Sequence, residues 1–223
     1  MCKKRLLFLS VISLFLFTSC FEFIEEISFN KDGSGSAMLT INLSKSKTKI
    51  ASIMLLDSVN GYKVPSKKTI KKELDKIVQK IKVTKGIHHV KSTLNFDEYI
   101  VAVSCDFDTV EALNTVLKAF SSKRDALVMQ KHKHFKYDKT TQTFVRSHHF
   151  NIGKAFQSTK IKDRKVFKTA TYTGVYRFES TVKSCTNQQA KISKNKKAVM
   201  LRVTAQDIIS NKQTIKNKIQ LNN

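Results

Sequence analysis

The sequence contains no Trp, one Pro, six Gly and only four Cys among its 223 residues. The scarcity of Pro and Gly excludes collagen-like chains and Gly/Pro-rich low-complexity chains. Four Cys in a chain of this length exclude a disulfide-stapled scaffold. Hydrophobic residues make up 41% of the chain and include 15 Phe, which suffices for a core and excludes wholesale disorder. The length predicts one domain of roughly 200 residues or two small ones.

Acidic residues are also scarce, because 17 Asp and Glu stand against 41 Lys and Arg, for a formal net charge of +24. Such a surplus attracts anions, for example phospholipid headgroups, lipopolysaccharide phosphates, acidic polymers or nucleic acid. A coding bias towards Lys, Asn and Ile would produce the same surplus as surface filler. The composition therefore leaves both interpretations open.

The first twenty residues have the layout of a secretory signal peptide. A basic segment, 1–5, precedes twelve uncharged apolar residues, 6–17, and small residues then lead to Cys20. This apolar run is shorter than the ~20 residues that span a bilayer. No later segment approaches membrane length, so we expect the mature chain to attach to a membrane surface without crossing it.

The end of this segment, Phe17-Thr-Ser-Cys20, resembles the lipobox of bacterial lipoproteins, although Phe17 stands where Leu or Val is usual. The resemblance implies a signal peptide at 1–19, cut before Cys20, and a diacylglyceryl and acyl anchor on that Cys. Two acyl chains are enough for stable attachment to a membrane. The mature chain, 20–223, would then carry 38 basic residues against 17 acidic ones, a net charge of +21.

Phe21, and not Asp, follows the anchor Cys. By resemblance to the sorting rules of Gram-negative lipoproteins, this implies the outer membrane, on its periplasmic face or at the cell surface.

Hydrophobic periodicity predicts a single α+β domain: an antiparallel sheet built of hairpins, with two to three helices packed on it. The predicted strands are 22–30, 36–43, 86–94, 98–107, 125–137, 143–150, 170–183, 188–193 and 197–204. The predicted helices are 46–57, 66–82 capped by Ser66 and 108–121 capped by Asp108, and 205–210 has short helical character. The basic segment 151–168 is predicted to be a loop and 213–221 a tail.

Two stretches resemble a loose class of lipid-anchored envelope proteins, the lipoproteins of the LppM-like type. The first is the strand pair around Lys31-Asp-Gly-Ser-Gly35, beside the anchor, and the second is the Asn-containing strand–turn–strand of 178–199. The middle of the chain, 45–170, has no match. The resemblance implies a membrane-attached α+β domain without established enzymology, and it supplies no functional residue beyond Cys20.

Common enzyme motifs are absent from the sequence: it has no Gly-x-Ser-x-Gly elbow, His-Glu-x-x-His, Walker loop or dinucleotide fingerprint. Glu25 and Glu26 are neighbours on a predicted strand, so their side chains point to opposite faces and make a poor acid/base pair. Asp106 and Asp108 flank a strand-to-helix corner, where capping explains them. The sequence therefore predicts a non-catalytic protein without a cofactor.

All six His occur in close pairs, at 88–89, 132 and 134, and 148–149. If the hairpin turns near Thr140, His132 and His134 on one strand face would meet His148 on the other. Three imidazoles suit Zn²⁺ or Cu²⁺. The alternative is a set of surface His in a Lys-rich hairpin, and a register slip of one residue would separate them.

Cys105 and Cys185 each end a predicted strand. An oxidising periplasm would permit a disulfide between them. The alternative is that both are small buried hydrophobic residues.

Three functions fit these observations. The first is a lipid-anchored interaction or structural module that meets an anionic membrane or an envelope protein through basic residues: Lys67, Lys71, Arg164, Lys165, Lys196 and Lys197. The second is a periplasmic carrier of a lipid or another apolar ligand, held between sheet and helices. The third is a His-based metal binder. Nucleic acid is a poor candidate partner, because the aromatics are Phe at core-like positions and the chain is exported.

Overall fold

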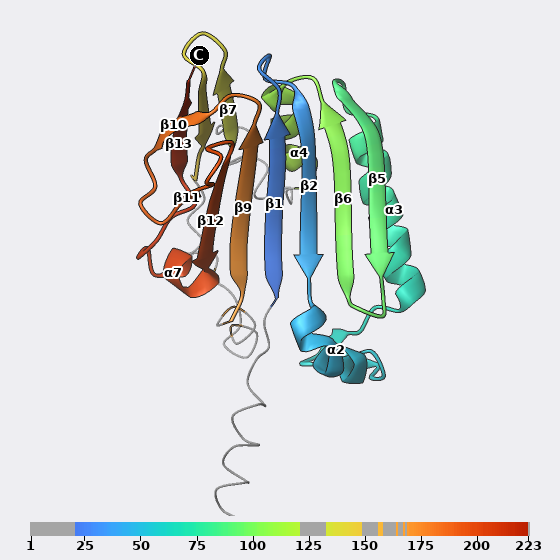
Figure 1. Ribbon diagram of the computed structural model, residues 1–223. Helices are drawn as coiled ribbons and strands as arrows, with labels where there is room; N and C mark the ends of the chain where they lie inside the picture. The colour runs from blue at the N-terminus through green and yellow to red at the C-terminus, as the bar shows by residue number, and fades with distance from the viewer. Residues whose placement is uncertain are drawn as a thin grey trace, which may run out of the picture.

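The computed structural model describes residues 21–120, 133–148, 156–157, 164, 167 and 169–222. Its fold is α+β, as predicted, with a seven-stranded sheet, a four-stranded sheet and a two-stranded sheet (Figure 1). Three residues of the predicted sites lie outside the described residues, namely Cys20, His132 and Lys165, and so does most of the predicted loop 151–168.

The seven-stranded sheet forms the broad face of the molecule in Figure 1. In spatial order its strands are β11 (Lys191–Ile192), β12 (Ala198–Thr204), β9 (Thr171–Phe178), β1 (Glu22–Phe29), β2 (Gly35–Asn42), β6 (Ile100–Phe107) and β5 (Ile87–Asn95). All neighbours are antiparallel except β1 and β9, which run parallel. The sheet is therefore mixed. On one side β1 pairs with β2, the other strand of its hairpin, and on the other side it pairs with β9, which comes from much later in the chain.

The four-stranded sheet corrects two sequence-based predictions. Its order is β10 (Val182–Cys185), β13 (Asn217–Leu221), β8 (Thr143–Arg146) and β7 (Phe135–Asp138). The predicted tail 213–221 contains β13, which is a central strand here. The predicted strand 170–183 is two strands, β9 and β10, which belong to different sheets. The two-stranded sheet joins β3 (Ser58–Val59) to β4 (Tyr62–Lys63).

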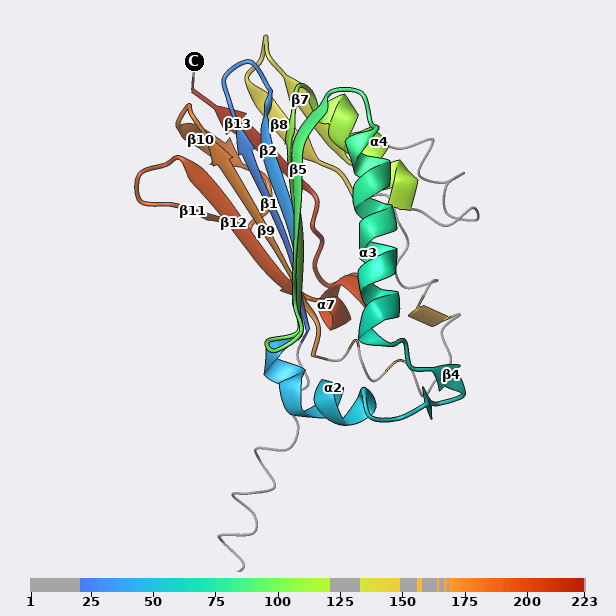
Figure 2. The same cartoon turned by 90° about the vertical axis from the view of Figure 1, so that its right-hand side faces the viewer.

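Two helices, α3 (Lys67–Lys82) and α4 (Val110–Phe120), stand on one side of the seven-stranded sheet (Figure 2). The predicted cap of α3 is confirmed, since the Thr69 amide donates to Ser66 Oγ over 3.1 Å. The predicted cap of α4 is wrong: the Ala112 amide bonds to Thr109 Oγ1 at 3.4 Å, whereas Asp108 contacts His88. Shorter helical segments are η2 (Ser44–Ser46), α2 (Lys47–Ile53) and α7 (Ala205–Ile209).

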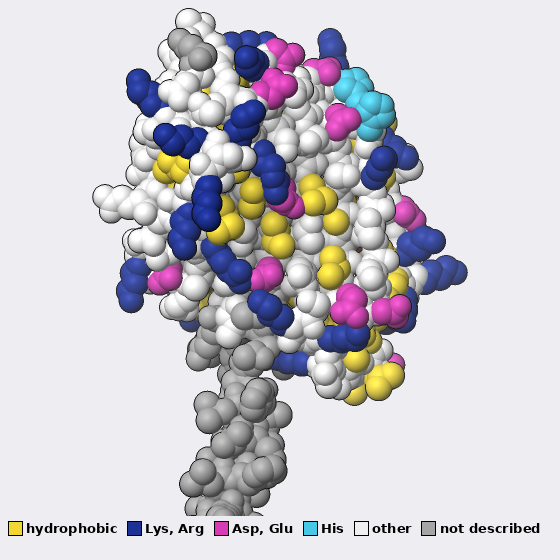
Figure 3. Space-filling model, in the orientation of Figure 1, with side chains coloured by type: hydrophobic (Ala, Val, Ile, Leu, Met, Phe, Trp, Pro, Cys, Tyr) yellow, Lys and Arg dark blue, Asp and Glu magenta, His cyan; other side chains and the backbone are white. Residues whose placement is uncertain are grey.

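The main core lies between the seven-stranded sheet and the elements on that same side. The four-stranded sheet covers one half of this face, where the Phe144 ring contacts those of Phe29, Tyr176 and Phe178. The opposite face of the sheet is turned to solvent, with Lys and Arg around hydrophobic side chains (Figure 3). Met38 and Met200 lie on that face and are 38% and 42% exposed.

Candidate functional site

A cleft of about 670 Å³ lies between α3 and the seven-stranded sheet. Strands β1, β2 and β6 line one wall, and α3 and α4 line the other. Among the described lining residues, those with a charged or hydroxyl side chain are Glu25, Glu26, Thr69 and Glu73, and the side chain of Glu26 points to the opposite face of the sheet. The remaining walls are apolar, and the volume falls within the ~300–1,000 Å³ typical of small-molecule sites.

The alternation of side chains along the strands builds the sheet wall of this cleft. Strand β2 contributes Ala37, Leu39 and Ile41, and β6 contributes Val101 and Val103 from the same face. On the other wall, the apolar face of α3 contributes four residues predicted from its helical spacing: Ile70, Leu74, Ile77 and Ile81. The cleft remains open because α3 packs mainly on the edge strand β5 and on α4, and not over the centre of the sheet.

The lining residues become more exposed from one end of the cleft to the other. Ile81, Leu113 and Val116 are buried at the α4 end. Pro65 and Thr69, where α3 begins, are exposed, and Ile41 is 37% exposed. The cleft therefore opens at the end of the molecule where α3 begins.

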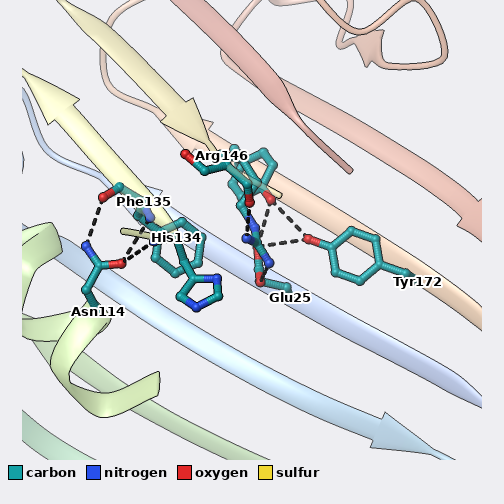
Figure 4. A network of polar contacts seen from close by, with 8 residues as sticks. Glu25, Asn114, His134, Phe135, Arg146 and Tyr172 are labelled. Carbon is teal, nitrogen blue, oxygen red and sulfur yellow. Dashed lines mark hydrogen bonds and ion pairs between the residues drawn. The ribbon is translucent and has the colours of Figure 1, made fainter. Parts of the chain in front are cut away.

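A buried ion pair lies beside the cleft, and one of its two residues, Glu25, belongs to the lining. Glu25 and Arg146 are 7% and 6% exposed, and Arg146 Nε and Nη2 each donate to the Glu25 carboxylate over 3.0 Å. The Tyr172 and Tyr176 hydroxyls donate to Glu25 Oε1 over 2.9 and 2.7 Å. Figure 4 shows Arg146 and Tyr172 converging on Glu25. The pair connects β1 of the large sheet to β8 of the small one.

The protonation states of this cluster follow from burial and from the carboxylate. Burial and then the charge of Glu25 raise the pKa of Tyr172 and of Tyr176 well above its ordinary value, so both phenols remain protonated donors. Burial alone would lower the pKa of Arg146, but the charge of Glu25 outweighs it and the pKa is raised. The guanidinium therefore stays charged. It also lies over the Phe135 ring, with its Cζ 4.8 Å from the ring centroid.

Asn114 attaches α4 to the edge of β7 (Figure 4). Its Nδ2 donates to the Phe135 carbonyl over 2.8 Å, and its Oδ1 accepts from the His134 and Phe135 amides at 2.8 and 3.0 Å. The side chain is 4% exposed and occupies the place of a neighbouring strand. It thus satisfies backbone groups of an edge strand that would otherwise be buried without partners.

The predicted histidine cluster depends on a register that the structure does not have. Strand β7 pairs Phe135 with Arg146, so His134 lies opposite Ser147, whose amide donates to the His134 carbonyl over 2.8 Å. The predicted opposition of His132 and His148 assumes a register shifted by one residue from that of β7 and β8. His132 itself lies outside the described residues, so the grouping of His132, His134 and His148 stays a prediction. Within the described part of the chain, no three His, Cys, Asp or Glu side chains are grouped as metal ligands.

Of the predicted basic contact residues, the five in the described part of the chain do not form one patch. Lys67 lies at the β5–β6 turn, with its Nζ 5.2 Å from the centroid of Phe96. Lys196 and Lys197 lie at the other end of the sheet, where the Lys197 carbonyl accepts from the Phe178 amide. Lys71 is exposed on α3, and the Arg164 guanidinium lies over the Phe156 ring. A different set of Lys lines a shallow polar depression beside the four-stranded sheet: Lys133, Lys136, Lys139 and Lys218.

The remaining sequence-based candidates have structural roles. Glu25 and Glu26 point to opposite faces of the sheet, as predicted. Glu25 is buried, whereas Glu26 is ion-paired with Arg177 at 2.9 Å on the solvent side. Cys105 and Cys185 are free thiols on β6 and β10, so they do not form the disulfide that the sequence permitted. Cys105 is buried, in agreement with the alternative prediction of a small buried hydrophobic residue. Sequence reasoning missed Arg146 and Asn114. The signal available in the sequence was a single polar residue among apolar ones, Arg146 at the end of β8 and Asn114 within α4.

Comparisons with known proteins add little to this geometry. No family model matches the chain, and no curated protein matches it. The folded domain of the Mycobacterium tuberculosis protein LppM, solved by NMR, is structurally similar, with a TM-score of 0.43 and 9% sequence identity. The match covers 90% of this chain and 88% of that domain. In the described residues, no helix is both long enough and apolar enough to cross a membrane.

Proposed function

We propose that this protein is a lipid-anchored envelope protein that binds the apolar part of a lipid in the cleft between α3 and the seven-stranded sheet. The observation that supports the proposal is a cleft of about 670 Å³ with almost entirely apolar walls, open at one end. Apolar surface exposed to water is unfavourable by about 25 cal/mol per Å². An acyl chain placed in the cleft would remove both its own surface and that of the walls from water.

The proposed role is binding without catalysis. In the described part of the chain, Glu25 is the only carboxylate that is buried, and it reaches the cleft. Its oxygens already accept from Arg146, Tyr172 and Tyr176. A carboxylate held in this way is a poor general base, because taking up a proton would break charged hydrogen bonds. It gives the sheet wall of the cleft one polar group instead.

The anchor and the compartment remain the sequence-based part of the proposal. Acylation at Cys20 would hold the domain at a membrane, which we propose to be the outer membrane. Membrane lipids would then be the apolar molecules closest to the cleft. Contact of the basic surface with anionic headgroups would add to this attachment.

A pair of variants on adjacent residues of β6 tests the cleft. Val103 lines the cleft, whereas Ala102 belongs to the opposite face of the sheet. Wild-type protein stripped of lipid should bind a fluorescent polyene fatty acid saturably. Val103→Phe should weaken that binding at least tenfold by filling the cleft, and Ala102→Phe should not.

The same titrations can overturn the proposal. Wild-type protein that shows no saturable binding, and that copurifies with no lipid by mass spectrometry, would do so. Equal affinities of Val103→Phe and Ala102→Phe would place the bound probe elsewhere on the molecule.

A further inference from the structure

Two consecutive leucines project from one end of the molecule. Leu55 is 86% exposed and Leu56 is 53% exposed, and they directly follow helix α2 and its C-cap, Met54. The short hairpin β3–β4 comes next and exposes half of Tyr62. We call residues 47–63 the α2 tip. A single exposed leucine is ordinary. Two exposed leucines at one turn, together with an exposed Tyr, instead form a small apolar patch, which we call the apolar point.

The α2 tip lies at the end of the molecule where the described chain begins. Figures 1 and 2, which differ by a quarter turn, both show α2 beside the first residues of β1. Glu22, at the start of β1, is ion-paired with Lys45 over 3.2 Å, just before α2. Phe21 is the first described residue, so Cys20 precedes this end of the chain in sequence.

Basic residues outnumber acidic ones around the apolar point, where Lys45 and Lys47 are ion-paired with Glu22 and Glu98. Residues 45–68 contain six Lys and a single Asp. Leucine and tyrosine side chains beside a group of Lys form the combination that settles in the interface of an anionic bilayer: the apolar groups enter the acyl boundary while the ammonium groups meet phosphates. A protein partner with an acidic groove would need a defined shape opposite this turn, whereas a bilayer needs none.

We propose that the α2 tip is a membrane-contacting element that inserts Leu55 and Leu56 into the interface of an anionic lipid bilayer. Its position has a second consequence, which rests on the proposed function of the cleft. Pro65 and Thr69, at the open end of the cleft, directly follow the α2 tip in the chain. Insertion of the tip therefore turns the mouth of the cleft towards the bilayer, so that a lipid enters from the membrane and not from water.

The absence of Trp from the sequence makes a direct test available. Leu55→Trp introduces a single fluorescent reporter at the tip of the full-length protein. Val83→Trp is the matched control, because Val83 is 83% exposed but follows the far end of α3. Both positions are exposed, so neither substitution disturbs the core. Each protein is reconstituted into phosphatidylglycerol vesicles with brominated acyl chains, and into phosphatidylcholine vesicles with the same bromination.

In phosphatidylglycerol vesicles, Leu55→Trp should emit further to the blue and be quenched at least threefold more strongly than Val83→Trp. Adding Lys49→Glu and Lys63→Glu to Leu55→Trp should reduce that quenching. Equal quenching of the two reporters would overturn the proposal. So would a blue shift of Leu55→Trp that depends on protein concentration without vesicles, since a second copy of the chain would then cover the leucines.

The failure of this proposal and that of the cleft are distinguishable. A Leu55→Trp protein that binds the fatty-acid probe but is not quenched overturns the membrane-contacting tip alone. A protein whose tip is quenched but whose cleft binds no fatty acid overturns the proposed function and leaves the tip intact.

Discussion

Glu25 is the residue at which the two sheets and the cleft meet. It sits on β1, lines the cleft and accepts hydrogen bonds from Arg146 on β8 and from two tyrosines on β9. Desolvating two charges is expensive, so a buried pair such as this one is maintained only with good geometry and extra hydrogen bonds, both of which are present. The pair therefore favours a single position of the four-stranded sheet on the seven-stranded sheet.

Removing one member of this pair should be far more harmful than removing both. Arg146→Met leaves the Glu25 charge buried and should lower the free energy of unfolding by about 3–5 kcal/mol. The double variant Glu25→Gln, Arg146→Met should recover much of that loss, because the amide oxygen still accepts from the tyrosines. Urea denaturation of the wild type, Glu25→Gln, Arg146→Met and the double variant gives the coupling energy. Strictly additive effects would contradict a coupled pair.

Cys105 predicts how stability should change at alkaline pH. Burial, followed by the charge of Asp106, raises the pKa of its thiol from 9.0 to about 11. Between these values the unfolded chain loses the proton that the folded chain retains, so the free energy of unfolding falls as the pH rises. This contribution should be fully present below pH 9 and lost towards pH 11, with Tyr172 and Tyr176 acting in the same direction.

The matched experiment compares wild type with Cys105→Ala by denaturation at pH 9 and at pH 11. The variant should show a smaller fall in stability between the two. An equal or larger fall would mean that Cys105 does not carry this part of the pH dependence.

At the scale of elements, local signals were reliable and distant pairings were not. The hairpins β1–β2 and β5–β6 and the helix α3 were predicted, because the residues that determine them are close in sequence. Strand β13 was predicted as a tail, since its partners β8 and β10 come from elsewhere in the chain. The break between β9 and β10 was missed because the residues before and after it both alternate like a strand and no Pro or Gly marks the break.

The attachment of α4 to β7 predicts a specific weakness. Asn114→Leu keeps the branched shape of the side chain but removes the partners of three backbone groups on β7. Leaving a buried polar group unsatisfied costs about 1–3 kcal/mol, so the variant should be at least that much less stable. Hydrogen exchange at the His134 and Phe135 amides should accelerate. Thr115→Ala, on the exposed side of the same helix, should change neither quantity, and equal effects of both would contradict the role of Asn114.

At the scale of the whole molecule, the functional elements are arranged along one axis. The α2 tip and the open end of the cleft share the end where β1 begins, whereas the α4 end of the cleft is buried. The excess of Lys is spread over several faces, so charge alone does not define a single binding surface. An anchor at the N-terminus would therefore act together with the tip to orient the domain.

The anchor itself is tested by fractionation of cells that express the full chain. Cys20→Ala should move the protein from the membrane fraction to the soluble fraction, because the acylation site is lost. Cys185→Ala, which removes a thiol on β10, should leave it in the membrane fraction. Firm membrane attachment of Cys20→Ala would contradict lipid anchoring.

The sequence by itself determined the α+β class, most of the hairpins, the amphipathic helix α3 and the features that predict an export signal and anchor at Cys20. These depend on residues that are neighbours in the chain, where spacing and turn chemistry act directly. Only the tertiary structure decided the register of β7 and β8, which differs by one residue from the register assumed in the sequence analysis, and the burial of Glu25 against Arg146. It also decided that α3 lies over the sheet edge and leaves an apolar cleft, because helix placement depends on packing across the whole fold.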